Sequence, residues 1–317
     1  MALPLGAASL YTNSTRTSIT DWLNDGAWGT SGTAGVNYLP GATVSDAPVI
    51  GRYAAETITL SGNANAGTGS IGTVNVAPSN GYASTLQLLT GAYLETTASV
   101  HIGPSSAAGT LDISGGQLRV NTAGTGYLDI GIASGGSSAS KLILSGDADV
   151  QIGGRLIAGN ATGETATVEV VGSNVSFYAG VSGGSTIELR ATSLLKFIAD
   201  AAGVSTLNTT GGLDIKAGAT LSLDLSAYTG GTQTFVLLNG GANAASATSY
   251  FTTDTLDAIV AAATYDTSAY SLALAYDASA YDLKLTVTAV PEPAQTAAIL
   301  GLLTLSIFAR KRRKFRN

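Results

Sequence analysis

The sequence predicts an all-β protein: a right-handed parallel β-helix, or β-solenoid, with capping strands and one C-terminal transmembrane helix. Three observations predict the solenoid. Short strand-like segments recur about every 25 residues, which is the scale of a repeat architecture. Apolar and polar residues alternate within these segments, as in half-buried strands. Turns that contain glycine separate them, and the chain holds 40 Gly in 317 residues.

The composition removes most of the usual catalytic side chains. The chain contains no Cys, one His and one Met, and only 11% of its residues are charged. Without Cys there is no disulfide framework, thiol nucleophile or thiolate metal site. We therefore expect no catalytic residues, no metal site and no cofactor.

The charge divides the chain into an acidic body and a basic tail. The net charge is −6, with 15 Lys and Arg against 21 Asp and Glu. Six of the basic residues lie in residues 310–316, which leaves nine basic residues against 21 acids, or −12, for residues 1–309. Nucleic-acid binding needs a basic surface for the phosphates, so we expect no nucleic-acid partner.

The N-terminal segment, residues 1–19, has two interpretations. The first eight residues lack both a basic n-region and a full apolar h-region. We interpret residues 1–19 either as the remnant of a longer, truncated signal peptide or as the start of the mature protein.

Residues 20–84 are predicted to form an N-terminal cap and the first strands. Both tryptophans, Trp22 and Trp28, fall in this segment, ahead of the turn at Pro40-Gly41. The first rung of a stacked structure needs a cover, because an open apolar edge aggregates. We expect the tryptophans in this cap; the alternative is a pair that stacks on a sugar.

Residues 85–229 are predicted to form the solenoid repeats. Acids such as Asp112 and Glu169 alternate with aliphatic residues and therefore point to the opposite face of their strands. Stacking the rungs about 4.8 Å apart buries the aliphatic faces in one interior and pairs the backbones. The predicted repeat cores begin at Thr85, Thr110, Lys141, Thr167, Thr186 and Gly212.

Residues 230–289 break the repeat and are predicted to form C-terminal capping strands. Segments 233–238, 270–276 and 281–287 alternate like strands, and residues 255–263 indicate a short helix or a loop. Strands rich in Tyr suit a cover over the last rung.

Residues 290–317 contain three parts in order. Val290, Pro291, Glu292 and Pro293 come first, and the prolines keep this segment extended. The apolar residues 294–309 would form a helix of roughly 24 Å, which spans a bilayer only with snorkelling ends or local thinning. A basic cluster follows and would lie on the cytoplasmic side, with the body outside. It consists of Arg310, Lys311, Arg312, Arg313, Lys314 and Arg316.

This tail resembles the PEP-CTERM sorting signal of Gram-negative and related bacteria, which is sometimes labelled an ice-binding protein C-terminal domain. The resemblance implies that an exosortase, a membrane transpeptidase, recognises Pro291-Glu292-Pro293 and processes the protein during export. The repeats are similar to those of autotransporter passenger domains. The expected location is the membrane before processing, and then the cell surface or an extracellular matrix with exopolysaccharide as a partner.

Two candidate sites in the body concern catalysis. His101 alternates with Val100 and Ile102, so we expect it on the outer face of a strand, outside any catalytic triad. Asp147 and Asp149 share a predicted strand face roughly 6.5 to 7 Å apart, a separation also found between the carboxylates of inverting glycosidases. A polysaccharide lyase or hydrolase is therefore the enzymatic alternative.

Two further patterns concern binding. Glu169, Glu188 and Asp214 occupy the same position of successive predicted cores, which suggests either a weak Ca²⁺ ladder or solvated, register-shifted acids. Ice-binding faces need regular Thr-x-Thr arrays, whereas the triplets 57–59 and 286–288 are isolated in the sequence. The sequence thus favours a structural or adhesive surface protein, with a glycan- or ice-binding module as the other alternative.

Overall fold

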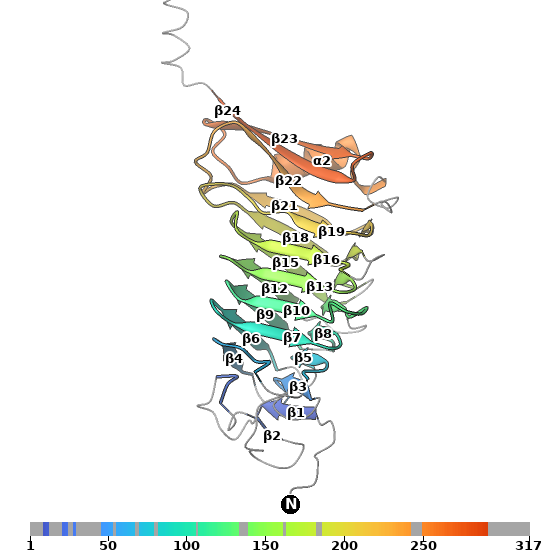
Figure 1. The fold of residues 1–317 in the computed structure, drawn as a ribbon. Helices are drawn as coiled ribbons and strands as arrows, with labels where there is room; N and C mark the ends of the chain where they lie inside the picture. The colour runs from blue at the N-terminus through green and yellow to red at the C-terminus, as the bar shows by residue number, and fades with distance from the viewer. Residues whose placement is uncertain are drawn as a thin grey trace, which may run out of the picture.

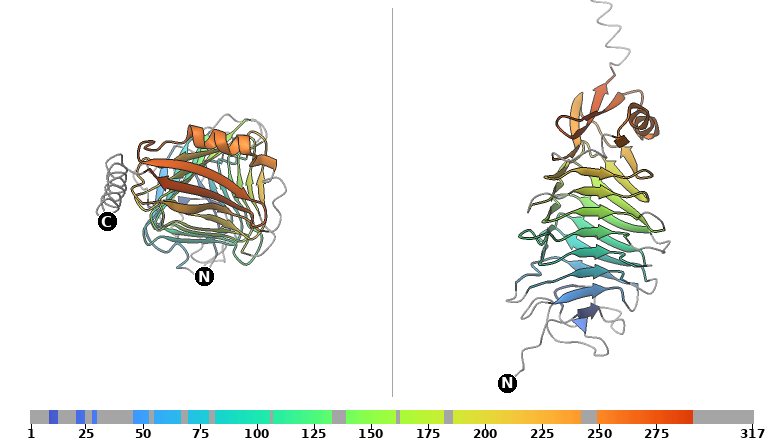
Figure 2. Two further views of the ribbon diagram at one scale, coloured as in Figure 1. Left: turned by 90° about the horizontal axis from the view of Figure 1, so that it is seen from above. Right: turned by 90° about the vertical axis from the view of Figure 1, so that its right-hand side faces the viewer.

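The protein folds into a parallel β-solenoid, which confirms the mostly-β repeat fold (Figure 1). In the computed structural model the strands stack along one axis into a rod with an apolar interior (Figure 2). The structure describes residues 9–12, 21–24, 28–29, 46–52, 55–66, 70–78, 82–105, 107–132, 139–160, 163–181, 186–241 and 249–290.

Three sheets, called I, II and III here, form the walls of the rod in these ranges. Sheet I runs in the order β2 (Trp28–Gly29), β1 (Ser9–Thr12), β3 (Ala47–Ile50), β5 (Val74–Val76), β8 (Val100–Ile102), β11 (Leu128–Ile130), β14 (Leu156–Ala158), β17 (Ile187–Leu189) and β20 (Leu213–Ile215). Sheet II runs in the order β23 (Tyr270–Asp277), β24 (Asp282–Ala289), β22 (Gln233–Asn239), β19 (Leu207–Thr209), β16 (Ser176–Ala179), β13 (Asp149–Ile152), β10 (Gln117–Val120) and β7 (Tyr93–Thr96). Sheet III runs in the order β21 (Thr220–Asp224), β18 (Ser193–Ile198), β15 (Thr165–Val171), β12 (Ala139–Ser145), β9 (Gly109–Ser114), β6 (Ser84–Leu89) and β4 (Thr57–Leu60).

Parallel, in-register pairing converts the sequence repeat into continuous apolar columns. In sheet III, Leu142 on β12 lies between Leu111 on β9 and Val168 on β15, and all three side chains are fully buried. Each such side chain contributes about 1.5–3 kcal/mol through burial. The complete column contains Ile58, Leu86, Leu111, Leu142, Val168, Leu195 and Leu221.

The structure corrects two of the six predicted repeat cores. The first four lie in sheet III, but the cores at Thr186 and Gly212 lead into β17 and β20 of sheet I. Sheet III continues instead through β18 and β21, where Leu194 and Thr220 follow Thr167 in register. The short step from Thr167 to Thr186 therefore arises because it joins strands of two different walls.

The N-terminal end of the rod buries both tryptophans. Trp22 and Trp28 are 0% exposed and pack edge to face, with their ring centroids 4.8 Å apart. The indole N–H of Trp28 donates a 3.0 Å hydrogen bond to the carbonyl of Trp22. The pair is therefore part of the apolar core, as the cap prediction requires, and neither ring is accessible for stacking on a sugar.

The C-terminal end is covered by antiparallel strands and a helix. β24 pairs with β22 on one side and with β23 on the other, both antiparallel. Helix α2 (Thr253–Ala262) lies beside β23 at this end of the rod (Figure 2). It begins at Thr252, whose Oγ1 accepts the backbone N–H of Thr255, and it buries Leu256 and Ile259. Both the predicted strands and the short helix are thus confirmed.

The predicted membrane helix at residues 294–309 lies outside the described residues. Within the described ranges, no helix is long and apolar enough to cross a bilayer.

Polar side chains also connect neighbouring turns of the solenoid. Asp200, in the turn after β18, accepts hydrogen bonds from the N–H and hydroxyl of Ser173, both 2.9 Å long, in the turn after β15. It also accepts the N–H groups of Ala202 and Gly203, each at 2.8 Å. Desolvation of Asp200 favours its neutral form, but these donors outweigh it, so that the pKa of Asp200 is lowered.

The apolar column predicts that truncating an inward side chain lowers the free energy of unfolding more than truncating an outward one. Leu142→Ala should lower the free energy of unfolding by about 2–5 kcal/mol, because it leaves a cavity between two turns. The adjacent outward variant Ile143→Ala is the matched control and should cost about 1 kcal/mol or less. Urea unfolding followed by circular dichroism would measure both; equal losses would contradict the register described above.

The lowered pKa of Asp200 predicts a pH-dependent contribution to stability. The ionised form is favoured in the folded state, so this contribution is present above the unfolded pKa of about 3.9 and is lost as the pH falls through the folded pKa. Asp200→Asn should therefore be less stable than wild type at pH 7, and the difference should shrink below about pH 4.

Urea midpoints measured between pH 7 and pH 3 would test this pH dependence. Asp147→Asn is the control, since the exposed Asp147 carboxylate accepts no hydrogen bond within the described part of the chain. A difference for Asp200→Asn that stays constant with pH would show that ionisation of Asp200 does not stabilise the fold.

Candidate functional site

Charged side chains gather on the outer face of sheet I. His101 on β8 and Asp129 on β11 are in register, and 2.8 Å separates Nδ1 of His101 from Oδ2 of Asp129. Glu188 on β17 accepts a 2.7 Å hydrogen bond from Nε of Arg190, and its other oxygen lies 3.5 Å from Nη1 of Arg155. The contacts of His101 with Asp129 and of Arg155 with Glu188 join successive turns of the solenoid, whereas Arg190 and Glu188 are neighbours in the sequence.

The His101–Asp129 pair combines an accessible imidazole with a buried carboxylate. The His101 side chain is 24% exposed, whereas Asp129 as a residue is 4% exposed. Arg155 lies over the ring of Tyr127, with its Cζ atom 5.1 Å from the ring centroid. Hydrogen bonding to Tyr127 raises the pKa of Arg155; desolvation partly offsets this rise, and the nearby charges of Glu188 and Asp129 add to it. The buried carboxylate of Asp129 is therefore paired with His101 through Oδ2, and Arg155 adds a nearby positive charge.

Such a pair is suited to orient the imidazole and to exchange a proton. A carboxylate at Nδ1 fixes the tautomer of a histidine and leaves Nε2 for exchange of a proton. The hydroxyl oxygen of nearby Ser99 accepts the backbone N–H of Tyr127 at 3.0 Å, so it takes part in strand pairing. The prediction that His101 lies on an outer strand face is confirmed. Its partner Asp129 was not predicted, although Leu128-Asp129-Ile130 repeats the pattern of Val100-His101-Ile102.

Asp147 and Asp149, the candidate carboxylates of the enzymatic alternative, do not face a substrate together. Asp149 begins β13, and its Oδ2 is hydrogen-bonded to the guanidinium of Arg119. Arg119 also donates to the backbone carbonyl of Asp149 at 2.9 Å. Asp147 is exposed in the preceding turn rather than in the strand. The shared strand face expected for the two aspartates is therefore wrong.

The predicted three-acid ladder is also wrong in one member. Glu188 and Asp214 are in register in sheet I, but Glu169 lies on β15 of sheet III, where Lys196 is its in-register neighbour. Cationic side chains already accompany these acids: Lys216 lies 2.8 Å from Asp214. Among the described residues, no group of three His, Cys, Asp or Glu side chains could hold a metal ion.

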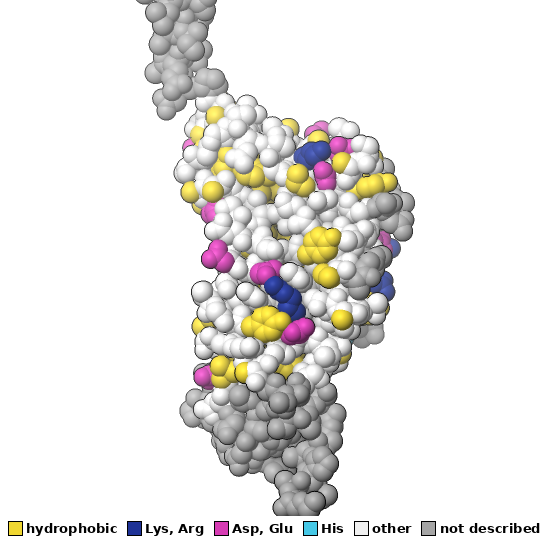
Figure 3. All heavy atoms as spheres, viewed as in Figure 1, with side chains coloured by type: hydrophobic (Ala, Val, Ile, Leu, Met, Phe, Trp, Pro, Cys, Tyr) yellow, Lys and Arg dark blue, Asp and Glu magenta, His cyan; other side chains and the backbone are white. Residues whose placement is uncertain are grey.

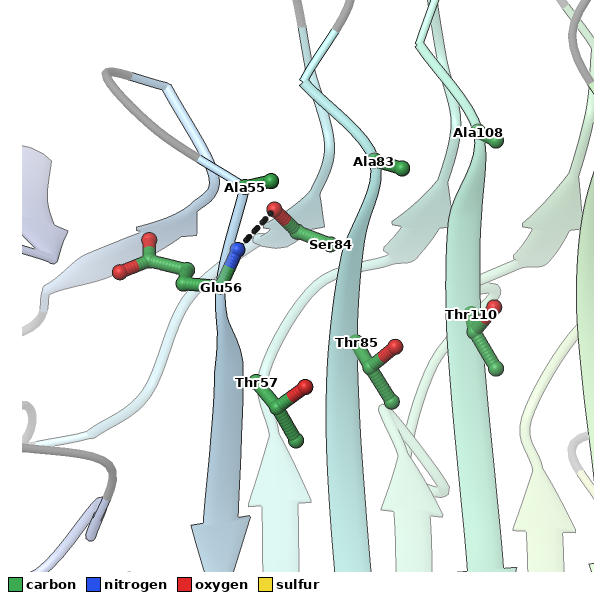
Figure 4. A pocket seen from close by; sticks show the side chains of 8 residues that line it. All are labelled: Ala55, Glu56, Thr57, Ala83, Ser84, Thr85, Ala108 and Thr110. Atoms are coloured by element: carbon green, nitrogen blue, oxygen red, sulfur yellow. Dashed lines mark hydrogen bonds between the residues drawn. The ribbon is translucent and has the colours of Figure 1, made fainter.

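A hollow of about 390 Å³ lies at the beginning of β4, β6 and β9 (Figure 4). Thr57, Thr85 and Thr110 are in register along it, but Thr59 meets Gln87 on the next turn, so the Thr-x-Thr triplet 57–59 is not repeated there. The next residue in this row is Lys141, which ends the run of threonines after three turns. Besides the threonines, the hollow is lined by Ala55, Glu56, Ala83, Ser84 and Ala108.

Glu56, beside this hollow, connects neighbouring segments of the chain through hydrogen bonds. Its backbone N–H donates to Oγ of Ser84 at 3.2 Å, while its carboxylate points away from the threonine row (Figure 4). That carboxylate accepts the N–H of Gly51 at 2.6 Å and the hydroxyl of Thr12. Desolvation raises the pKa of Glu56 and the Gly51 hydrogen bond partly offsets it. Glu56 therefore faces the chain itself rather than a ligand in the hollow.

The predicted sorting motif would begin at Val290, where the capping strands end. Val290 directly follows β24, is 42% exposed, and donates its N–H to the carbonyl of Ala269 at 2.8 Å. Pro291, Glu292, Pro293 and the six basic tail residues lie outside the described residues. No family model, curated protein or solved structure matches this chain.

The ion pairs of sheet I predict unequal effects on stability. Glu188→Gln should lower the free energy of unfolding by about 1–2 kcal/mol, because it weakens two charge-assisted contacts at a nearly buried carboxylate. The matched control is Lys216→Gln, which removes a half-exposed ion pair and should cost less than about 0.5 kcal/mol. Chemical denaturation would compare them, and a larger loss for Lys216→Gln would contradict this ranking.

Proposed function

We propose that this chain is an exported structural or adhesive β-solenoid of the cell surface or extracellular matrix, sorted by an exosortase-type transpeptidase and without catalytic activity. The observation that supports it best is the position of Val290. The solenoid and its capping strands end at Ala289, and the exposed Val290 follows at once. A sorting enzyme would thus meet its motif just beyond a folded, covered end.

The finer features of the proposal follow from general constraints. Connections between parallel strands of one sheet are nearly always right-handed, so we assign a right-handed turn to the solenoid. Residues 294–309 would cross the membrane before processing, and the basic residues from Arg310 onwards would stay in the cytoplasm. After cleavage the acidic body would be released to the surface or the matrix.

The mechanism of such a protein is architectural. A rod of stacked turns buries one continuous interior and presents repeated outward rows along its length. Each turn contacts its neighbours, so the rod keeps its shape without a second domain to support it. The outward rows are then available for contacts with the surrounding matrix, including exopolysaccharide.

The sorting step can be tested with antibodies against the body and the tail. The chain, expressed behind a signal peptide in a bacterium with an exosortase, should reach the surface with the body epitope and lose the tail epitope. In an exosortase deletion strain, both epitopes should stay together in the membrane fraction. Replacing Pro291, Glu292 and Pro293 by Ala should have the same effect as the deletion.

The matched control for this test is Thr288→Ala, an exposed change two residues before the motif. It should be processed like the wild-type chain. If the tail epitope remained on the surface as strongly as the body epitope in the exosortase-positive strain, processing at the motif would be wrong.

A further inference from the structure

The outer face of sheet II carries one unbroken row of polar and aromatic side chains. Its members are in register from strand to strand, so they follow the long axis of the rod. On the side that Figure 3 shows, most of the coloured and white surface is uncharged, and only a few Lys, Arg, Asp and Glu side chains are visible. The row contains Glu95 on β7, Arg119 on β10, Gln151 on β13, Tyr178 on β16, Asn208 on β19 and Asn239 on β22.

Several polar side chains on this face have no partner within the described part of the chain. In the described ranges, the side chains of Gln117, Gln151 and Tyr178 make no hydrogen bond. Amides offer both donors and acceptors, and the tyrosine hydroxyl does so as well. Sheet I differs, because its outward Asp129, Ile157 and Glu188 are each less than one tenth exposed. The free groups of sheet II therefore suit a ligand that has both donors and acceptors.

Tyr178 adds an aromatic surface in the middle of this row. It is 38% exposed, and its in-register neighbours are Gln151 and Asn208. A pyranose ring has an apolar C–H face and a rim of hydroxyl groups, which matches an exposed aromatic ring flanked by amides. Tyr93 begins the adjacent row of the same face, three strands away.

The charge on this face argues for a neutral polymer. Arg119 is the one cationic residue on β7, β10, β13, β16 and β19, and it is bonded to Asp149. Glu95 and Asp149 leave these strands with a net negative charge. Both this surface and the acidic body would repel an anionic polysaccharide electrostatically.

From these observations we propose that the outer face of sheet II binds a neutral polysaccharide that lies along the rod across several turns. Tyr178 stacks on one sugar ring, and Gln117 and Gln151 exchange hydrogen bonds with hydroxyl groups. This inference deepens the proposed function, since it gives the adhesive rod a ligand class and a face.

Affinity electrophoresis of the full chain would test the proposal, with the neutral polymers dextran and hydroxyethyl cellulose and the anionic polymer alginate in separate gels. The wild-type chain should be retarded by at least one neutral polymer. Tyr178→Ala combined with Gln151→Ala should weaken this binding about tenfold or more, and Tyr178→Phe should retain most of it.

The matched control is Tyr82→Ala, which removes an equally exposed tyrosine (40%) that precedes β6 of sheet III. Its binding should equal that of the wild-type chain, and melting temperatures would show that all variants are folded. Retardation by alginate alone, no retardation by either neutral polymer, or equal loss in Tyr82→Ala would overturn the proposal. Each of these results would leave the sorting test unaffected, because that test reads the tail and not the ligand.

Discussion

Parallel pairing in strict register is the constraint on which the rest of the structure depends. Each outward or inward position lies beside the equivalent position of the next turn. One register therefore allows both the backbone hydrogen bonds and the burial of the apolar side chains. Leu142, for example, stacks on Leu111 and Val168 while its backbone pairs with theirs. A slip of one residue would turn these side chains outward and expose the interior along the whole column. Backbone hydrogen bonding and apolar burial therefore favour the same register.

The same register limits where charges can lie on the outer faces. Neighbouring turns are about 4.8 Å apart, so like charges in register destabilise the fold. The chain places opposite or neutral partners at several of these positions: Glu95 meets Arg119, and Glu169 meets Lys196. Where Glu188 meets Asp214, nearby Arg and Lys side chains compensate both acids. Much of the charge clustering on the rod thus has a structural reason, and clustering alone does not identify a catalytic centre.

Sequence patterns predict the strands and their buried faces, which depend on nearby residues. They do not predict which strands and side chains become neighbours, because that depends on the register between turns. Alternation identifies strands and their buried faces, as at residues 167–170, because it repeats every second residue. It does not show to which sheet a strand belongs, so the cores at Thr186 and Gly212 were assigned to the wrong wall. The motif that begins at Val290 is continuous and can be read directly. By contrast, His101 and Asp129, or Gln151 and Tyr178, meet only because the intervening residues complete one turn.

The outer face of sheet II matters because Gln151 and Tyr178, at its centre, make no hydrogen bond within the described part of the chain. The inward positions are fixed by the core, whereas an outward strand position accepts many residues, and Thr or Val would suit the strand as well as Tyr. An exposed ring at Tyr178 between two amides therefore has no role in the packing described here. The row also runs from β22, beside the capped C-terminal end, to β7 near the N-terminal end. If the tail holds the C-terminal end at the membrane, this row leads away from the cell surface, which is the direction in which a matrix polymer would be met.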